Sequence, residues 1–152
     1  GDTERIVAKA VPNGARWAGR GQGGDFDGCV AVELADPRQF GGLLSRIVLP
    51  GPSIVALPFR ARGPLPCPVK RTALPPGEMM GIVVLATVPG RKDAVAAAAT
   101  GRGAAAVGAL LTDGVIVQIH AGGDAALRAA MAALAALPDV TRARSAVVVD
   151  QP

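Results

Sequence analysis

A glycine-rich turn in the first half of the sequence, Gly23-Gly24-Asp25-Phe26-Asp27, carries the residue types best suited to binding a small charged ligand. Two consecutive glycines let the backbone approach a ligand closely and turn N–H groups toward a carboxylate. Asp25 or Asp27 can pair with an ammonium group, so a zwitterionic amino acid would suit this turn. We predict that Gly23, Gly24, Asp25, Phe26 and Asp27 bind the ligand; the simpler alternative is a hairpin turn with solvated carboxylates.

Catalysis and metal binding have little support in the sequence. The two cysteines, Cys29 and Cys67, form no CxxC motif, and His120 is the only histidine, so we expect no metal site. No serine or cysteine stands in a nucleophile elbow, and no pair of carboxylates has a spacing that would define an acid and a base. We therefore expect a non-enzymatic protein without a cofactor.

A second Gly-Gly-Asp sequence, at residues 122–124, precedes a stretch of helical spacing. The N–H groups at the start of such a helix could bind an anion. Asp124 is also a suitable N-cap, and a capping carboxylate would occupy those N–H groups. We expect the cap rather than the anion site.

Composition indicates a soluble chain with a core of small aliphatic side chains. Half of the 152 residues are hydrophobic, yet only 3% are aromatic and tyrosine is absent. The longest uninterrupted apolar run, Ala129 to Leu137, is far shorter than the roughly 20 residues that cross a membrane. The net charge of +4 arises in residues 1–76. The basic residues there are spread thinly, and Arg60, Arg62, Lys70 and Arg71 stand among prolines with almost no aromatic side chains to stack on nucleic-acid bases. We expect a cytoplasmic protein with no membrane contact and a solvated basic surface.

The second half of the sequence predicts a ferredoxin-like β-α-β-β-α-β unit. Runs rich in β-branched residues alternate with alanine-rich stretches of helical spacing, and turn dipeptides such as Pro89-Gly90 separate them. The expected strands cover residues 80–88, 105–111, 115–120 and 145–149, and the expected helices cover 91–100 and 125–137. Two right-handed crossovers would place both helices on one face of a four-stranded antiparallel sheet. The other face needs a cover, which the first half or a second copy of the chain could supply.

The first half has a truncated version of the same order of elements. We expect a helix over residues 2–10, strands over 15–19, 28–34 and 54–61, and a helix that Asp36 caps and that ends near Val48. Five prolines between residues 63 and 77 exclude a helix there and predict an extended arm or linker. The expected fold is therefore α+β, with a truncated ferredoxin-like unit over residues 1–62, an arm over 63–77 and a ferredoxin-like unit over 78–152.

Two stretches of the first half resemble the effector-binding (RAM) domain of the leucine-responsive/AsnC family of transcriptional regulators. They are GGDFDGCVAVEL at residues 23–34 and VKRTALP at residues 69–75, and ALPDVTRARSAVVV at residues 136–149 is similar to the approach to that domain's last strand. The resemblance implies two effector-type units in tandem and an amino acid bound at the GDFD turn. The family's helix-turn-helix is missing, so any contact with DNA is expected only through a missing domain or a partner.

The expected function is the sensing of a small-molecule effector, an amino acid, by a self-associating module of a transcriptional regulator. A structural function is the alternative, because Gly123-Asp124 before the second helix and the valine-rich last strand are similar to a bacterial microcompartment shell protein, which forms flat hexamers or trimers. A ferredoxin-like enzyme of the dimeric barrel type is disfavoured by the shortage of titratable groups. The regulator and the shell protein both predict a homo-oligomer.

Overall fold

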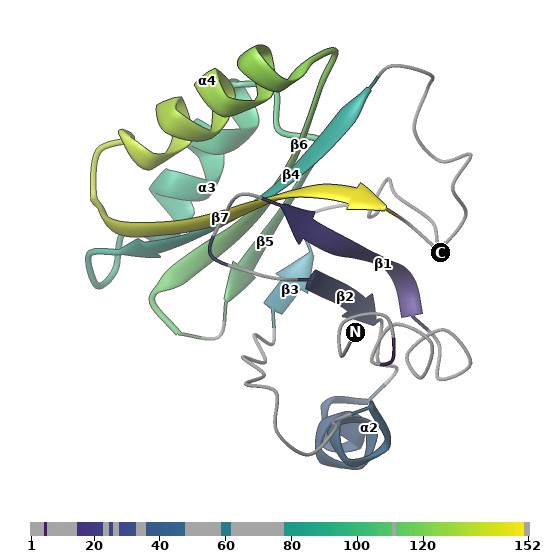
Figure 1. Ribbon diagram of the computed structural model, residues 1–152. Coiled ribbons are helices and arrows are strands. Elements are labelled where there is room, and N and C mark those ends of the chain that lie inside the picture. The colour runs from purple at the N-terminus through teal and green to yellow at the C-terminus, as the bar shows by residue number, and fades with distance from the viewer. Residues whose placement is uncertain are drawn as a thin grey trace.

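The computed structural model describes Arg5, Asp25 and residues 15–22, 28–32, 36–47, 59–61, 78–110 and 112–150 (Figure 1). The strands in these ranges form one seven-stranded sheet in the order β2-β1-β7-β4-β6-β5-β3, and each neighbouring pair is antiparallel. The strands are β1 (Ala15–Gln22), β2 (Gly28–Val32), β3 (Phe59–Ala61), β4 (Met79–Thr87), β5 (Ala106–Leu110), β6 (Gly114–Ala121) and β7 (Val140–Asp150). The helices are α2 (Phe40–Ile47), which follows a 3₁₀ turn at Pro37–Gln39, α3 (Lys92–Gly101) and α4 (Asp124–Ala135).

The second half of the chain folds as a ferredoxin-like unit. Its elements follow one another as β4-α3-β5-β6-α4-β7, and its strands stand in the sheet in the order β7-β4-β6-β5. Both helices lie on one face of these four strands (Figure 1). The predicted α+β fold with a β-α-β-β-α-β order is confirmed.

The two central strands, β4 and β6, are the longest continuous pair in the core of this unit. They pair over eight positions, from Met79 opposite Ala121 to Ala86 opposite Gly114. β4 is buried on both faces along most of its length. A strand buried on both faces is expected to read as a continuous apolar run rather than as an alternating one, and MGIVVLA does so.

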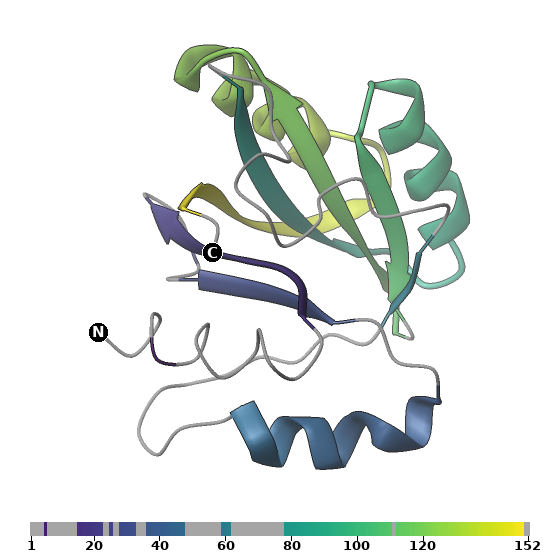
Figure 2. The ribbon, with the colours of Figure 1, turned by 90° about the vertical axis from the view of Figure 1, so that its right-hand side faces the viewer.

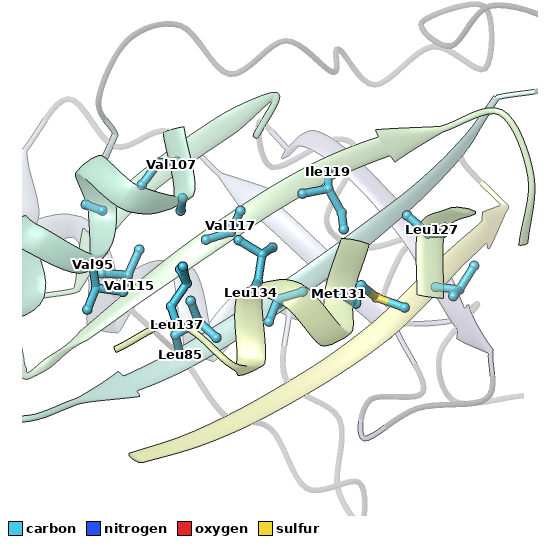
Figure 3. Close-up of a cluster of buried hydrophobic side chains, with 14 residues drawn as sticks. Leu85, Val95, Val107, Val115, Val117, Ile119, Leu127, Met131, Leu134 and Leu137 are labelled. Atoms are coloured by element: carbon cyan, nitrogen blue, oxygen red, sulfur yellow. The ribbon is translucent and has the colours of Figure 1, made fainter. Parts of the chain in front are cut away.

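The hydrophobic core lies between this sheet and the helices α3 and α4. Leu127, Met131 and Leu134 recur at helical spacing on α4 and point at the strands (Figure 3). The other buried members are Val83, Leu85, Val95, Ala96, Ala99, Val107, Val115, Val117, Ile119, Leu137 and Val147. Because nearly all of these side chains are aliphatic and many are small, the helices can pack close to the sheet.

The closest approach of α4 to the sheet is at Gly81 of β4. A Cβ atom at this position would lie 3.0 Å from Met131 Sδ and 3.2 Å from Leu127 Cδ1. Glycine leaves room for these two side chains to rest directly on the strand backbone.

The face of the sheet away from α3 and α4 is also buried within a single chain. Met80, Ile82, Gln118 and Ala146 point to this face and are at most 4% exposed. The sheet curls, so that its edge strands β2 and β3 bend away from the two helices and approach each other (Figure 2). Burial of these four residues therefore requires no second copy of the chain, and the homo-oligomer stays a prediction.

The described strands of the first half belong to the sheet of the second half. β1 pairs with β7 at one side of the ferredoxin-like unit, and β3 pairs with β5 at the other. β1 and β2 confirm the strands predicted over 15–19 and 28–34, whereas only residues 59–61 of the predicted strand 54–61 are described. The arm over 63–77 lies outside the described residues, as does the helix over 2–10 except for Arg5, which is helical.

The predicted cap at Asp36 is confirmed. The backbone N–H of Arg38 donates to Asp36 Oδ1 over 2.9 Å, and the Arg38 guanidinium pairs with the same carboxylate. This contact lowers the pKa of Asp36, mainly through the side-chain hydrogen bond from Arg38.

The prediction that Asp124 caps α4 is wrong. Gly123 occupies the N-cap position and Asp124 is the first helical residue. The Asp124 carboxylate instead accepts two hydrogen bonds from Arg128 Nε, one turn further along, at 2.9 and 3.1 Å. The guanidinium competes successfully because an i, i+4 pair lies on one face of the helix.

The last strand begins five residues earlier than the predicted range of 145–149. Asp139 adopts a positive φ of 68°, and β7 starts immediately after it at Val140. The sequence VTRAR contains three polar residues in no strict alternation, so its strand character is weaker in sequence than that of the apolar run that follows. None of the helices in the described part of the chain is long and apolar enough to cross a membrane.

Candidate functional site

Of the five residues predicted to bind a ligand, the structure describes Asp25. Its backbone N–H donates to the carbonyl of Ser145 over 2.7 Å, and the N–H of Ser145 donates to Asp25 Oδ2 over 2.9 Å. The ladder between β1 and β7 ends at Gln22 opposite Val147. The two hydrogen bonds between Asp25 and Ser145 therefore extend the ladder beyond Gln22. In the second of them, the acceptor is the Asp25 carboxylate rather than a backbone carbonyl. Gly23, Gly24, Phe26 and Asp27 lie outside the described residues.

The two carboxylate oxygens of Asp25 differ in their contacts. Oδ2 accepts a hydrogen bond from the backbone of β7. The residue is exposed, and Oδ1 accepts no hydrogen bond from a described residue. Asp25 thus combines a structural contact at Oδ2 with an exposed position at which Oδ1 accepts from none of the described residues. The simple alternative of a fully solvated carboxylate does not describe this residue.

We expect Asp25→Ala to lower the free energy of unfolding by about 1–2 kcal/mol, because the Ser145 N–H loses a charged acceptor. Asp25→Asn keeps an oxygen in the same place and is expected to lose less than half of that amount. Urea unfolding monitored by circular dichroism measures both variants. Equal stability of Asp25→Ala and the wild type would show that the hydrogen bond contributes nothing.

A groove runs along the side of α4, between that helix and the strands β4 and β7. It has a volume of about 280 Å³, and it is lined by Val83, Arg128, Met131, Ala132, Ala135, Ala143 and Ser145. Five of its seven lining residues are apolar, and two of these are alanines of α4, where larger side chains would fill the space. Arg128, with a side chain that is 49% exposed, supplies a positive charge.

Asp25 and the groove have one neighbour in common, Ser145. The groove is lined by Ser145, and Asp25 is bonded to the backbone of the same residue. Arg128 donates through Nε to Asp124, while its two Nη nitrogens donate to no described residue. The tertiary structure therefore places the Arg128 guanidinium in the lining of the groove and bonds Asp25, from the first half, to the backbone of another lining residue, Ser145. Sequence reasoning missed Arg128, since nothing in its local sequence distinguishes it from other surface arginines.

A polar cluster lies on the opposite face of the sheet. Gln118 and His120 alternate along β6 with the core residues Val117 and Ile119, so both point away from α3 and α4. Gln118 Nε2 lies 2.9 Å from His120 Nε2, and Glu78 Oε2 lies 3.9 Å from His120 Nδ1. Sequence reasoning singled out His120 alone; the polar–apolar alternation of VIVQIH is the signal that could have included Gln118.

Burial lowers the pKa of His120 from the ordinary value, while the nearby Glu78 carboxylate raises it by a smaller amount. The net direction favours the neutral imidazole over an ion pair with Glu78. With the Gln118 amide nitrogen facing the ring, that nitrogen donates to His120 Nε2 and the ring proton lies on Nδ1. The reversed amide with the other tautomer makes the same hydrogen bond in the opposite direction.

No described residues form a ready-made metal centre, since no three His, Cys, Asp or Glu side chains gather in those parts of the chain. Cys29 lies in β2, and Cys67 is outside the described residues. The start of α4 at Gly123 has no side-chain cap, and nothing in the described structure points to an anion there.

Comparison with known protein families, with characterised proteins and with solved structures finds no match to this chain. The resemblance to the leucine-responsive/AsnC effector domain and the alternative of a shell protein both remain predictions from sequence. The chain is established as a ferredoxin-like α+β protein, and its activity is argued from its sites.

Proposed function

We propose that this chain is a small-metabolite sensing module whose effector is an amino acid. The observation that carries the proposal is the position of Ser145, which lines the groove beside α4 and is hydrogen-bonded through its backbone to Asp25 of the predicted ligand turn. An effector seated there would meet a carboxylate, a guanidinium and an apolar surface together. These are the three chemical features that an aliphatic amino acid needs.

The charges of the site match the two ends of a zwitterion. Arg128 can donate through its Nη nitrogens to the effector carboxylate, and guanidinium–carboxylate hydrogen bonds are among the stronger ones. Asp25 Oδ1 can accept from the effector ammonium. Pairing each charge in this way avoids burying either one alone, which would cost several kcal/mol.

The apolar part of the groove suits a small aliphatic side chain. Val83, Met131, Ala132 and Ala135 supply its walls. A volume of about 280 Å³ lies just below the range of about 300–1,000 Å³ for drug-sized ligands. The groove thus favours a metabolite of amino-acid size over a nucleotide or a larger cofactor.

The wider role follows from the sequence resemblance. In that role the chain is a non-enzymatic, cytoplasmic, homo-oligomeric part of a transcriptional regulator, and DNA is contacted by another domain or a partner. Binding of the effector beside β7 would alter a strand that connects β1 of the first half with β4 of the second. This position is suitable for passing a signal between the two halves.

Calorimetric titration with each of the twenty standard amino acids tests the proposal. We expect one aliphatic amino acid to bind, and Arg128→Ala to weaken that binding at least tenfold, because the carboxylate loses its partner. Arg102→Ala, on the exposed end of α3, is the matched control and should bind as the wild type does. Asp25→Asn and Asp27→Ala test the ammonium end in the same way.

Two results would contradict the sensor. One is the absence of binding by any of the twenty amino acids, and the other is equal binding by Arg128→Ala. Native mass spectrometry then decides on the alternative, since flat hexamers or trimers that tile into sheets would favour a shell protein.

A further inference from the structure

The charge of the groove beside α4 is positive and has no counterpart of opposite sign in the lining. Arg128 is the one ionisable side chain in the described lining, which contains no Asp or Glu. Asp25 is bonded to the backbone of Ser145, but it does not belong to that lining. A concave, largely apolar surface with one positive charge attracts an anion, and its lining offers no carboxylate to an ammonium group.

The Arg128 guanidinium is held on the side that faces Asp124. Its Nε atom donates to both oxygens of the Asp124 carboxylate, at 2.9 and 3.1 Å. The two Nη nitrogens donate to no described residue, and together they form an edge that can bind a carboxylate through two parallel hydrogen bonds. The pair between Arg128 and Asp124 therefore leaves one carboxylate-binding edge of the guanidinium open.

Ser145 adds a neutral donor to the groove. Its backbone N–H and carbonyl are bonded to Asp25, whereas its hydroxyl makes no hydrogen bond with a described residue. A serine hydroxyl can donate to a carboxylate oxygen. The other lining residues are all apolar, namely Val83, Met131, Ala132, Ala135 and Ala143.

We propose that the groove binds a short aliphatic carboxylate, with Arg128 and Ser145 as donors to the carboxylate and the apolar residues in contact with the alkyl group. The inference rests on the groove of the proposed function and names the group that this groove recognises, which is the carboxylate; an ammonium group on the ligand is not required. At about 30 Å³ per heavy atom, the share of one water molecule in the liquid, isovalerate occupies about 210 Å³. The groove has a volume of about 280 Å³, so a branched acid of this size fits and a long-chain fatty acid does not.

Titration of the ¹⁵N-labelled protein with sodium isovalerate tests the inference through ¹H–¹⁵N correlation spectra. We expect saturable shifts of the amide signals of α4 and of residues 143–145 in β7. Isobutylamine has the same alkyl group with an ammonium in place of the carboxylate, and it should cause no saturable shift because its charge has the same sign as that of Arg128. Sodium chloride at the same concentration controls for ionic strength.

A variant that fills the groove tests its location. Ala132→Leu places a larger side chain in the lining and should weaken isovalerate binding about tenfold or more. Leucine favours the helix and Ala132 is exposed, so the fold is preserved. Ala129→Leu is the matched control, because it adds the same side chain to the same helix outside the lining, and it should bind as the wild type does.

Two further variants test the donors. Arg128→Ala should weaken isovalerate binding about tenfold or more, because the carboxylate loses its charged partner; the exposed pair with Asp124 contributes little to stability, so this variant keeps its fold. Ser145→Ala removes the hydroxyl, retains the backbone bonds to Asp25 and should weaken binding about threefold. Arg102→Ala, on the exposed end of α3, should bind as the wild type does.

The absence of saturable shifts with isovalerate overturns the inference, and so does equal binding by Ala132→Leu or Arg128→Ala, which would place the acid elsewhere. Saturable binding of isobutylamine overturns it as well, because the charge would then not select the ligand. Binding of an amino acid without binding of isovalerate contradicts this inference alone. Binding of isovalerate without binding of any amino acid contradicts the amino-acid effector alone.

Discussion

Leu127→Ala is expected to lower the free energy of unfolding by about 2–5 kcal/mol. Leu127 is fully buried at the place where α4 rests on Gly81. Removal of its isobutyl group leaves a cavity against a strand backbone that is held by neighbours on both sides. The sheet cannot move in to fill this cavity, so the cost should lie in the upper part of the range.

Chemical denaturation with an unchanged m-value measures this loss. Val88→Ala is the matched control, because Val88 is 38% exposed, and it should change the stability by less than about 0.5 kcal/mol. A loss below about 1 kcal/mol for Leu127→Ala would mean that α4 does not pack on the sheet as described.

Gly114→Val should lower the free energy of unfolding by about 3 kcal/mol, at the upper end of what overpacking costs. A Cβ atom at residue 114 would lie 2.6 Å from Leu110 Cδ1 and 3.0 Å from the backbone oxygen of Leu85. The leucine side chain can rotate away, but the Leu85 oxygen belongs to β4, the neighbour of β6 in the sheet. The substitution must therefore push two central strands apart.

Gly122→Val is the control at the other end of β6, since a Cβ atom there has no neighbour within 4 Å. Thermal unfolding of the two variants should separate their midpoints by about 6–12 °C, given a shift of about 2–4 °C per kcal/mol for a chain of this length. Equal midpoints would contradict the register in which β6 pairs with β4.

The elements of the second half could be predicted from sequence because the signals are local. The run MGIVVLAT, the alanine-rich helices and the turns at Pro89-Gly90 and residues 112–114 each act within a few residues of the chain. The cap at Asp36 was predictable for the same reason, since its acceptor serves an N–H two residues away. The cap at Asp124 failed because Arg128 offered an equally local competitor for the carboxylate.

Pairing between distant strands left no such signal. β1 lies beside β7 and β3 beside β5, although neither pair is close in sequence. The strands of the first half could form a sheet of their own or join the sheet of the second half. Which of the two forms depends on which exposed strand edges pair with each other. Backbone hydrogen bonding satisfies any edge equally well, so side-chain patterns did not specify these partners.

Local sequence determined the order of helices and strands in the ferredoxin-like unit and the residue types of the predicted ligand turn. The tertiary structure alone joined Asp25 to Ser145, 120 residues away, and Ser145 also lines the groove that contains Arg128. It also brought Glu78 to His120 and left Gln118 buried with an unpaired oxygen. Hydrophobic periodicity and the residue types of turns act over a few residues of the chain. A site is made by contacts between distant residues, and these form only when the strands of the whole sheet pair.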